Sequence, residues 1–188
     1  FYGLPGTYWH HALGERRGPA SITALREQGY GIEVFRSTPL YSPEFDKTVF
    51  TDVPGVRMLS DGRGPADWDA DLTRDFLAFL DQRDGVDPFF AFLFYDSPHA
   101  YALPDGYRQP FQPTIDGPTN YLTLGEGTDP VPPRNRYFNS VHYVDELVGQ
   151  VLDRLEADGL LEDSVVIITG DHGQEFNENG LNFWGHNG

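Results

Sequence analysis

A carboxylate and an imidazole stand side by side at Asp171 and His172, directly after the apolar run VVII at 165–168. Four consecutive β-branched residues predict a strand over 165–169 that is buried on both faces, as in parallel sheets. In open α/β sheets, ligands bind beyond the carboxyl ends of the strands, where these two side chains would lie. An oxygen ligand beside a nitrogen ligand suits zinc or manganese. The pair therefore predicts a metal site, although it would also fit a polar turn in which Asp171 caps a helix.

Two further histidines are candidates for the same edge of the sheet. His99 follows a second apolar run at 89–95, and His186 lies in the Gly- and Asn-rich segment that follows His172. Each would otherwise be an ordinary loop histidine. His142 falls near the apolar stripe of a predicted helix, and we interpret it as structural.

Longer motifs carry a resemblance to a known family. The stretch IITGDHGQEF at 167–176, followed by WGHNG at 184–188, resembles the C-terminal metal motif of the sulfatase branch of the alkaline phosphatase superfamily. Segment 94–99 resembles another strand end of that active site, 135–145 resembles the helix that precedes the strand of the metal motif, and 1–5 resembles the stretch just after the nucleophile. The resemblance points to the membrane-anchored members: lipoteichoic acid synthases, phosphoethanolamine transferases and sulfatase-like inner-membrane proteins that control lipopolysaccharide levels.

The resemblance implies roles for particular residues. Asp171 and His172 would bind a divalent metal ion (Zn, Mn, Mg or Ca), and His99 and His186 would contact the substrate, with His99 joining a second metal site in some members. The family's nucleophile, a threonine in the membrane-anchored branch, would lie upstream of Phe1. We therefore expect 1–188 to be part of one sulfatase-like domain that lacks the N-terminal nucleophile segment, with no catalytic nucleophile of its own and no turnover in isolation.

Two functions fit this resemblance. The first is a metal-dependent hydrolase or phosphotransferase that acts on phosphate or sulfate esters, including those of a lipid headgroup. Its parent would be anchored in the bacterial inner membrane by N-terminal helices, with this domain periplasmic or otherwise extracytoplasmic. The alternative is a catalytically silent regulatory domain that binds a lipid or protein partner in envelope homeostasis. A threonine or serine upstream of Phe1, flanked by Asn and Arg, would favour the enzyme.

Composition excludes several other classes. The formal net charge of −16 argues against nucleic acid and anionic membrane surfaces as direct partners, because both need clustered Lys and Arg. The absence of cysteine excludes the modified cysteine nucleophile of many sulfatases from this segment. The sequence also contains no apolar run long enough to span a membrane.

The elements that would position the site follow from periodicity. We predict helices at 19–29, 66–83 and 134–158, strands at 30–35, 89–95 and 165–169, and loop at 36–65. The last helix would bury a stripe of Val141, Val144, Val148, Val151, Leu152 and Leu155. Alternating strands and helices predict an α/β fold, a mostly parallel sheet flanked by helices, here a partial alkaline phosphatase-like domain.

A long connection at 100–133 contains seven prolines and no periodic pattern. Connections of this length in a compact domain are usually functional or disordered. Three tyrosines within it, Tyr101, Tyr107 and Tyr121, favour an ordered, substrate-facing loop at the edge of the active site over a linker.

Overall fold

The computed structural model describes residues 1–41, 44–53, 64–85, 87–117 and 119–186. It divides into an N-terminal unit, residues 1–63 and 68–95, and a C-terminal unit, residues 64–67 and 96–188. Part of the predicted loop at 36–65 lies outside the described residues. Each unit is described by itself below.

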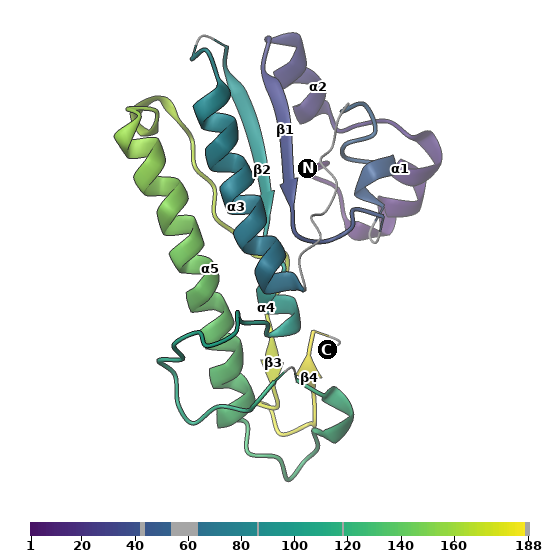
Figure 1. The fold of residues 1–188 in the computed structure, drawn as a ribbon. Coiled ribbons are helices and arrows are strands. Elements are labelled where there is room, and N and C mark those ends of the chain that lie inside the picture. The colour runs from purple at the N-terminus through teal and green to yellow at the C-terminus, as the bar shows by residue number, and fades with distance from the viewer. Residues whose placement is uncertain (42–43, 54–63, 86, 118, 187–188) are drawn as a thin grey trace. The chain divides into compact units, whose positions relative to one another are not determined.

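The N-terminal unit is built on two parallel strands (Figure 1). Strand β1 (Gly31–Arg36) pairs with β2 (Phe89–Phe94), with Gly31 opposite Phe89 and Arg36 opposite Phe94. The connection between them contains helix α3 (Pro65–Gln82). The unit begins with η1 (Gly6–Tyr8), α1 (Trp9–Glu15) and α2 (Ala20–Glu27), and η2 (Phe45–Lys47) follows β1. The predicted strand–helix–strand alternation is confirmed here.

Aromatic and aliphatic side chains cover both faces of this sheet. On one face, Phe76 and Phe79 of α3 contact Phe35 and Phe89, with ring centroids 5.3–6.5 Å apart. On the other face, Val34 belongs to a buried cluster against which three rings of β2 pack, Phe90, Phe92 and Phe94. Because successive residues of a strand point to opposite faces, a sheet buried on both sides needs the continuous apolar run that β2 has.

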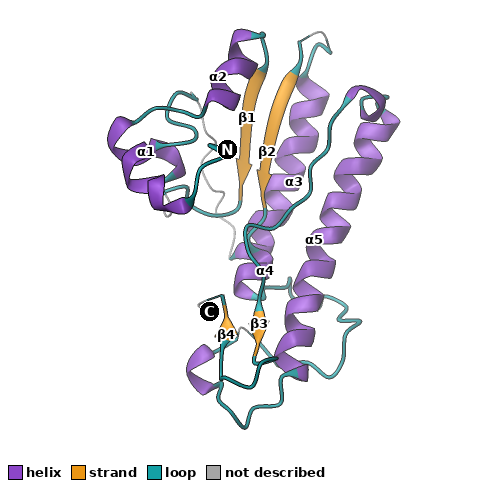
Figure 2. Cartoon of the chain, turned by 180° about the vertical axis from the view of Figure 1, so that it is seen from behind, coloured by secondary structure: helices purple, strands orange, loops and turns teal. Residues whose placement is uncertain are grey.

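The C-terminal unit is organised along one long helix, α5 (Val131–Ala157), with a small antiparallel hairpin near one end (Figure 2). The hairpin pairs β3 (Glu175–Phe176) with β4 (Trp184–Gly185). The unit also contains α4 (Ser97–Ala100), η3 (Tyr121–Thr123) and η4 (Leu161–Asp163). Helix α5 begins three residues earlier than predicted, with prolines in its first turn, where the missing N–H groups cost little.

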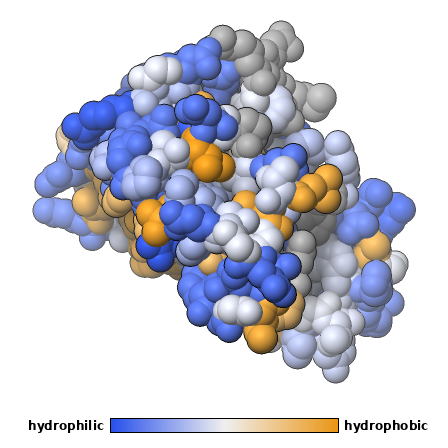
Figure 3. All heavy atoms as spheres, turned by 90° about the horizontal axis from the view of Figure 1, so that it is seen from below, coloured by the Kyte–Doolittle hydropathy of each residue, from blue (hydrophilic) through white to orange (hydrophobic). Residues whose placement is uncertain are grey.

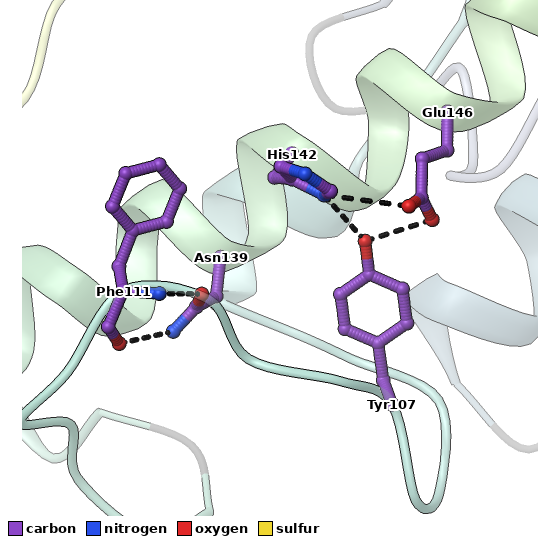
Figure 4. Close-up of polar contacts among 5 residues, drawn as sticks. All are labelled: Tyr107, Phe111, Asn139, His142 and Glu146. Atoms are coloured by element: carbon purple, nitrogen blue, oxygen red, sulfur yellow. Dashed lines mark hydrogen bonds and ion pairs between the residues drawn. The ribbon is translucent and has the colours of Figure 1, made fainter.

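The buried face of α5 differs from the predicted apolar stripe. Val141, a member of that stripe, is 39% exposed, whereas the N-terminal half of the helix buries four polar residues, Asn135, Arg136, Asn139 and Ser140. Asn135, Arg136 and Asn139 bond to the backbone of the 100–133 loop, whereas Ser140 donates to the Tyr137 carbonyl within α5. Asn139 accepts from the Phe111 N–H and donates to the Phe111 carbonyl, both at 3.0 Å (Figure 4). Periodicity alone misses such a face, because its partners are backbone groups.

His142 fastens the same loop to α5. The Tyr107 hydroxyl lies 2.7 Å from Nδ1 of His142 and donates to Glu146 Oε2 at 2.9 Å (Figure 4). Since the single hydroxyl proton goes to Glu146, Nδ1 of His142 carries a proton and donates to the Tyr107 oxygen. His142 therefore has the structural role expected of it. The predicted place of the loop at the edge of an active site stays a prediction.

The predicted buried strand at 165–169 is wrong for this structure. Residues 164–170 form no strand, and their apolar side chains are exposed: Val165 90%, Val166 44%, Ile167 80% and Ile168 68%. A β-branched run becomes a strand only when a neighbouring backbone accepts and donates its hydrogen bonds. Among the described residues, each sheet has two strands, and neither includes this run.

The surface reflects the composition. On the face seen in Figure 3, hydrophilic residues cover most of the area and hydrophobic residues form small separate patches. Within the described ranges, no helix combines the length and the apolar character needed to cross a membrane.

Candidate metal centre

The three histidines singled out for the site come together in the C-terminal unit, and Asp171 adjoins His172 in the sequence. One ring nitrogen from each of His99, His172 and His186 lies within 4.8 Å of the others, and all three residues are exposed. The rings of His172 and His186 stack with centroids 4.6 Å apart, and those of His99 and His186 lie 5.1 Å apart. Asp171 Oδ1 lies 3.6 Å from Nε2 of His172. Their proposed division into metal ligands and substrate contacts stays a prediction.

His172 presents its outer nitrogen as a ligand. Its Nδ1 lies 2.9 Å from the carbonyl oxygen of Gly173. A carbonyl only accepts, so Nδ1 carries the proton and Nε2 keeps its lone pair. The backbone N–H of His172 donates to Asp171 Oδ1 at 3.0 Å. The backbone thus orients both side chains of the pair.

His99 sits on the single turn of α4, which a tyrosine ends. The Ala102 N–H donates to the Ser97 carbonyl at 2.9 Å, closing the turn around Tyr101. Tyr101 adopts a left-handed conformation with φ of +51° and is only 1% exposed. A non-glycine residue holds this conformation only when its surroundings enforce it.

His186 reaches the site through the hairpin. Glu175 is opposite Gly185, and Phe176 is opposite Trp184, so the residues after His172 and those before His186 run side by side. The Asn177 N–H closes the hairpin on the Phe183 carbonyl at 2.8 Å. Gly185 has a φ of +84°. The sequence separation of the two histidines is therefore the length of a hairpin.

Electrostatics favour a neutral imidazole at His186. Burial lowers the pKa of His186, and the nearby His172 and His99 lower it further, whereas Asp171 opposes the shift. Burial also raises the pKa of the Tyr137 hydroxyl, with a further contribution from the Asp171 carboxylate. A neutral imidazole keeps one N–H donor and one lone pair, so His186 can donate to an anion or bind a metal ion.

The donor set fits a divalent ion. Two ligands of a tetrahedral zinc ion lie about 3.3 Å apart, given zinc–ligand distances of about 2.0–2.1 Å. The 3.6 Å between Asp171 and His172 is close to this spacing, and the 4.8 Å limit of the histidine cluster would have to shorten. One carboxylate oxygen with imidazole nitrogens suits zinc or manganese better than magnesium or calcium.

A second layer beneath the histidines was not predicted. Gln174 donates from Nε2 to the hydroxyls of both Tyr101 and Tyr121. The sequence placed Tyr101 and Tyr107 facing the substrate, but Tyr101 is buried and Tyr107 binds α5. The predicted place of the loop beside a substrate stays a prediction, and only the tertiary structure shows which partner each hydroxyl takes.

Comparison with known proteins gives two sets of relatives. The chain is 25% identical over 175 residues to inner membrane protein YejM of Salmonella typhimurium (strain LT2), covering 92% of this chain and 24% of YejM. YejM of Salmonella typhi matches to the same extent. A stretch of 50 residues is 38% identical to choline-sulfatase of Rhizobium meliloti (strain 1021), covering 27% of this chain and 10% of that enzyme.

The chain spans about a quarter of the length of the YejM proteins that it matches. The model of the family described as Sulfatase matches residues 8–188, which include every histidine of the cluster and Asp171. On the strength of that match, the chain belongs to the Sulfatase family.

Proposed function

We propose that this chain is the metal-binding part of a sulfatase-like domain that hydrolyses or transfers phosphate or sulfate esters. The convergence of His99, His172 and His186, with Asp171 3.6 Å from His172, carries the proposal. Family membership implies an alkaline phosphatase-like α/β fold, and the parallel β1–β2 pair connected through α3 is consistent with part of it.

Asp171 and His172 hold the divalent ion in this proposal. Their donor atoms are 3.6 Å apart, and the proton on Nδ1 of His172 leaves Nε2 free to bind. The bound ion would supply Lewis acid polarisation of an ester oxygen. The carboxylate of Asp171 also offsets part of the positive charge of the divalent ion.

His99 and His186 bind the ester. The centroid of the His186 ring lies 5.1 Å from that of His99 and 4.6 Å from that of His172. Both His99 and His186 can donate an N–H to a phosphate or sulfate oxygen. These local donors matter because the chain carries a formal charge of −16, which repels anionic substrates at long range.

The parent protein belongs to a membrane in this proposal. The YejM relatives are named as inner membrane proteins, and the absence of cysteine fits an oxidising compartment. We place this domain on the extracytoplasmic side, where a phosphate- or sulfate-bearing lipid headgroup is one substrate of the right chemistry.

Calorimetric titration of the chain with Zn²⁺ and Mn²⁺ tests the metal site. Asp171→Asn and His172→Ala should each weaken binding by about tenfold or more. His11→Ala removes an exposed histidine of the N-terminal unit and should leave the affinity unchanged. Equal affinities for the parent chain and both site variants would refute the site.

A second titration, with inorganic phosphate and sulfate on the metal-loaded chain, separates the roles of the histidines. His99→Ala and His186→Ala should weaken anion binding while largely preserving metal binding. A loss of metal affinity as large as that of Asp171→Asn would instead make them ligands.

In the parent protein, metal-dependent hydrolysis of p-nitrophenyl phosphate or sulfate that Asp171→Ala abolishes would support the enzyme. Metal binding without turnover would support the catalytically silent domain.

A further inference from the structure

Three segments that are remote in sequence supply the histidine cluster. His99 comes from the turn of α4, His172 precedes β3, and His186 follows β4. All three side chains are exposed, so burial of the rings themselves does not fix their spacing. The β3–β4 hairpin relates the segments of His172 and His186, and the contacts beneath these segments complete the spacing.

One amide group connects these contacts. Nε2 of Gln174 carries two hydrogens and donates to the hydroxyl of Tyr101 and, at 3.0 Å, to that of Tyr121. Gln174 lies two residues from His172, and Tyr101 lies two residues from His99. A single side chain therefore joins the first two segments directly.

Tyr121 extends the connection to the third segment. Its ring packs on Gly185, the residue before His186, so closely that a Cβ at Gly185 would lie 3.0 Å from the Tyr121 Cε1 atom. The ring of Tyr121 also contacts that of Tyr101, with centroids 6.1 Å apart. A shift of the Tyr121 ring would therefore alter its contact with the backbone that carries His186.

Tyr101, the other acceptor of the Gln174 amide, is held by several neighbours. The Tyr101 ring packs edge-on against Tyr137, at 5.5 Å, and lies 6.3 Å from Phe176 of β3. Arg136 of α5 donates to the Tyr101 carbonyl at 2.9 Å. The left-handed backbone of Tyr101 is thus held from several sides, and its hydroxyl is a fixed point for the amide.

We propose that Gln174 is the positioning residue of this site: its amide sets the spacing of His99, His172 and His186 by holding Tyr101 and Tyr121 together. The consequence for metal and anion binding rests on the proposed function. The geometric claim does not depend on it, because the hydrogen bonds are made between protein side chains alone.

Gln174→Met tests the claim, because methionine has a similar length and no N–H donor. In metal-free protein, nuclear Overhauser effects between the rings of His172 and His186, and of His99 and His186, should weaken or vanish. Zn²⁺ affinity should fall by about tenfold or more, as for other residues that orient metal ligands. The absorption spectrum of the Co²⁺ form should also change, since it reports ligand geometry.

Two controls keep the test specific. Gln150→Met alters an exposed glutamine on α5 and should change neither the ring-to-ring signals nor the affinity. Tyr121→Phe removes one of the two hydrogen bonds and leaves the ring on Gly185, so it should give a smaller loss. The double variant Gln174→Met/Tyr121→Phe should be no worse than Gln174→Met alone.

The outcomes separate the two proposals. Unchanged ring-to-ring signals in a folded Gln174→Met variant would overturn the positioning role, and so would losses that simply add in the double variant. Loss of these signals in a chain whose parent binds no Zn²⁺ would keep the positioning role and refute the metal site instead. If Gln174→Met does not fold, the comparison of Tyr121→Phe with the parent decides the matter by the same signals.

Discussion

At the scale of single residues, the site depends on backbone groups as much as on side chains. The Gly173 carbonyl sets the tautomer of His172, a task that carboxylates often perform in metal sites. The neighbouring acids Glu175 and Glu178 are therefore not needed to orient this ring. Glu178 instead accepts from the backbone N–H of Phe176.

Gly185 is the position where a single methyl group should do most harm. Its φ of +84° is unfavourable for any residue with a Cβ, and the added atom would press on the Tyr121 ring at 3.0 Å. We expect Gly185→Ala to lower the free energy of unfolding by about 1–2 kcal/mol. The phosphate and sulfate affinity of the metal-loaded chain should fall as well, because His186 would shift. Urea denaturation and calorimetry measure the two effects.

Gly149→Ala is the matched control. Gly149 lies in α5, and a Cβ there would meet nothing within 4 Å. Alanine should stabilise this helix by about 0.5–1 kcal/mol, so the two substitutions should have opposite signs. If both changed stability equally, backbone conformation at Gly185 would not be the cause.

At the scale of elements, α5 holds the proline-rich loop through a polar face. Asn139 is fully buried and satisfies both backbone groups of Phe111. Asn139→Ala would remove the partners of the Phe111 N–H and carbonyl, which are only partly buried, and should cost about 1–3 kcal/mol of stability. Limited proteolysis should then cut within 104–113 faster. The protease should cut Gln150→Ala, a change on the exposed side of the same helix, at the parental rate.

The contact between α3 and the residue after β2 makes stability depend on pH. Tyr95 bonds to the Thr73 hydroxyl at 3.0 Å, and burial raises the pKa of Tyr95 to about 12. Because the folded form resists ionisation, the stabilising effect is complete below pH 10 and is lost as pH rises towards 12. Between pH 9 and 11 the parent should lose about 1 kcal/mol more than Tyr95→Phe does.

Urea midpoints at several pH values measure this difference. Other tyrosines of raised pKa, such as Tyr101 and Tyr137, are present in both proteins and cancel in the comparison. Parallel pH profiles for the two proteins would show that Tyr95 ionises equally in the folded and unfolded states.

The sequence predicted elements whose signal is local. Periodicity located α3 and α5 to within a few residues, and the apolar run of β2 marked a strand covered on both sides. The run at 165–168 has the same local signal, but strand formation needs a paired neighbour, which the sequence of one segment does not encode. The local signal agrees with the tertiary context at β2 and conflicts with it at 165–168.

The candidate site divides in the same way. Motif resemblance selected His99, Asp171, His172 and His186, and the structure brings the three histidines together. Gln174 escaped notice although it lies inside the motif, because its role depends on tyrosines more than 50 positions away in the sequence. Partners so remote become visible only after the chain has folded.

At the scale of the whole molecule, charge governs encounters with ligands. A net charge of −16 repels phosphate and sulfate esters beyond the reach of the site. Salt shortens this repulsion, with a Debye length of about 10 Å at 0.1 M and about 3 Å at 1 M. Anion affinity should therefore fall less steeply with salt than in a site approached through a basic surface.

The exposed run of 165–168 has a consequence for the chain at high concentration. The run has four exposed β-branched residues, no charged residue and no proline. Segments of this composition tend to form cross-β assemblies. Net charge opposes such self-association, and salt removes that protection. In about 1 M NaCl, where charges are screened within about 3 Å, we expect light scattering and thioflavin T fluorescence to rise with time.

A lysine in the run should act as a gatekeeper. Ile167 is 80% exposed, so Ile167→Lys should leave folding intact and suppress assembly. Leu122→Lys makes the same change at a position that is 95% exposed and outside the run, and it should assemble like the parent. Equal protection by both lysines would assign the effect to net charge alone. Protection by Ile167→Lys but not by Leu122→Lys would show that the run at 165–168 drives the assembly.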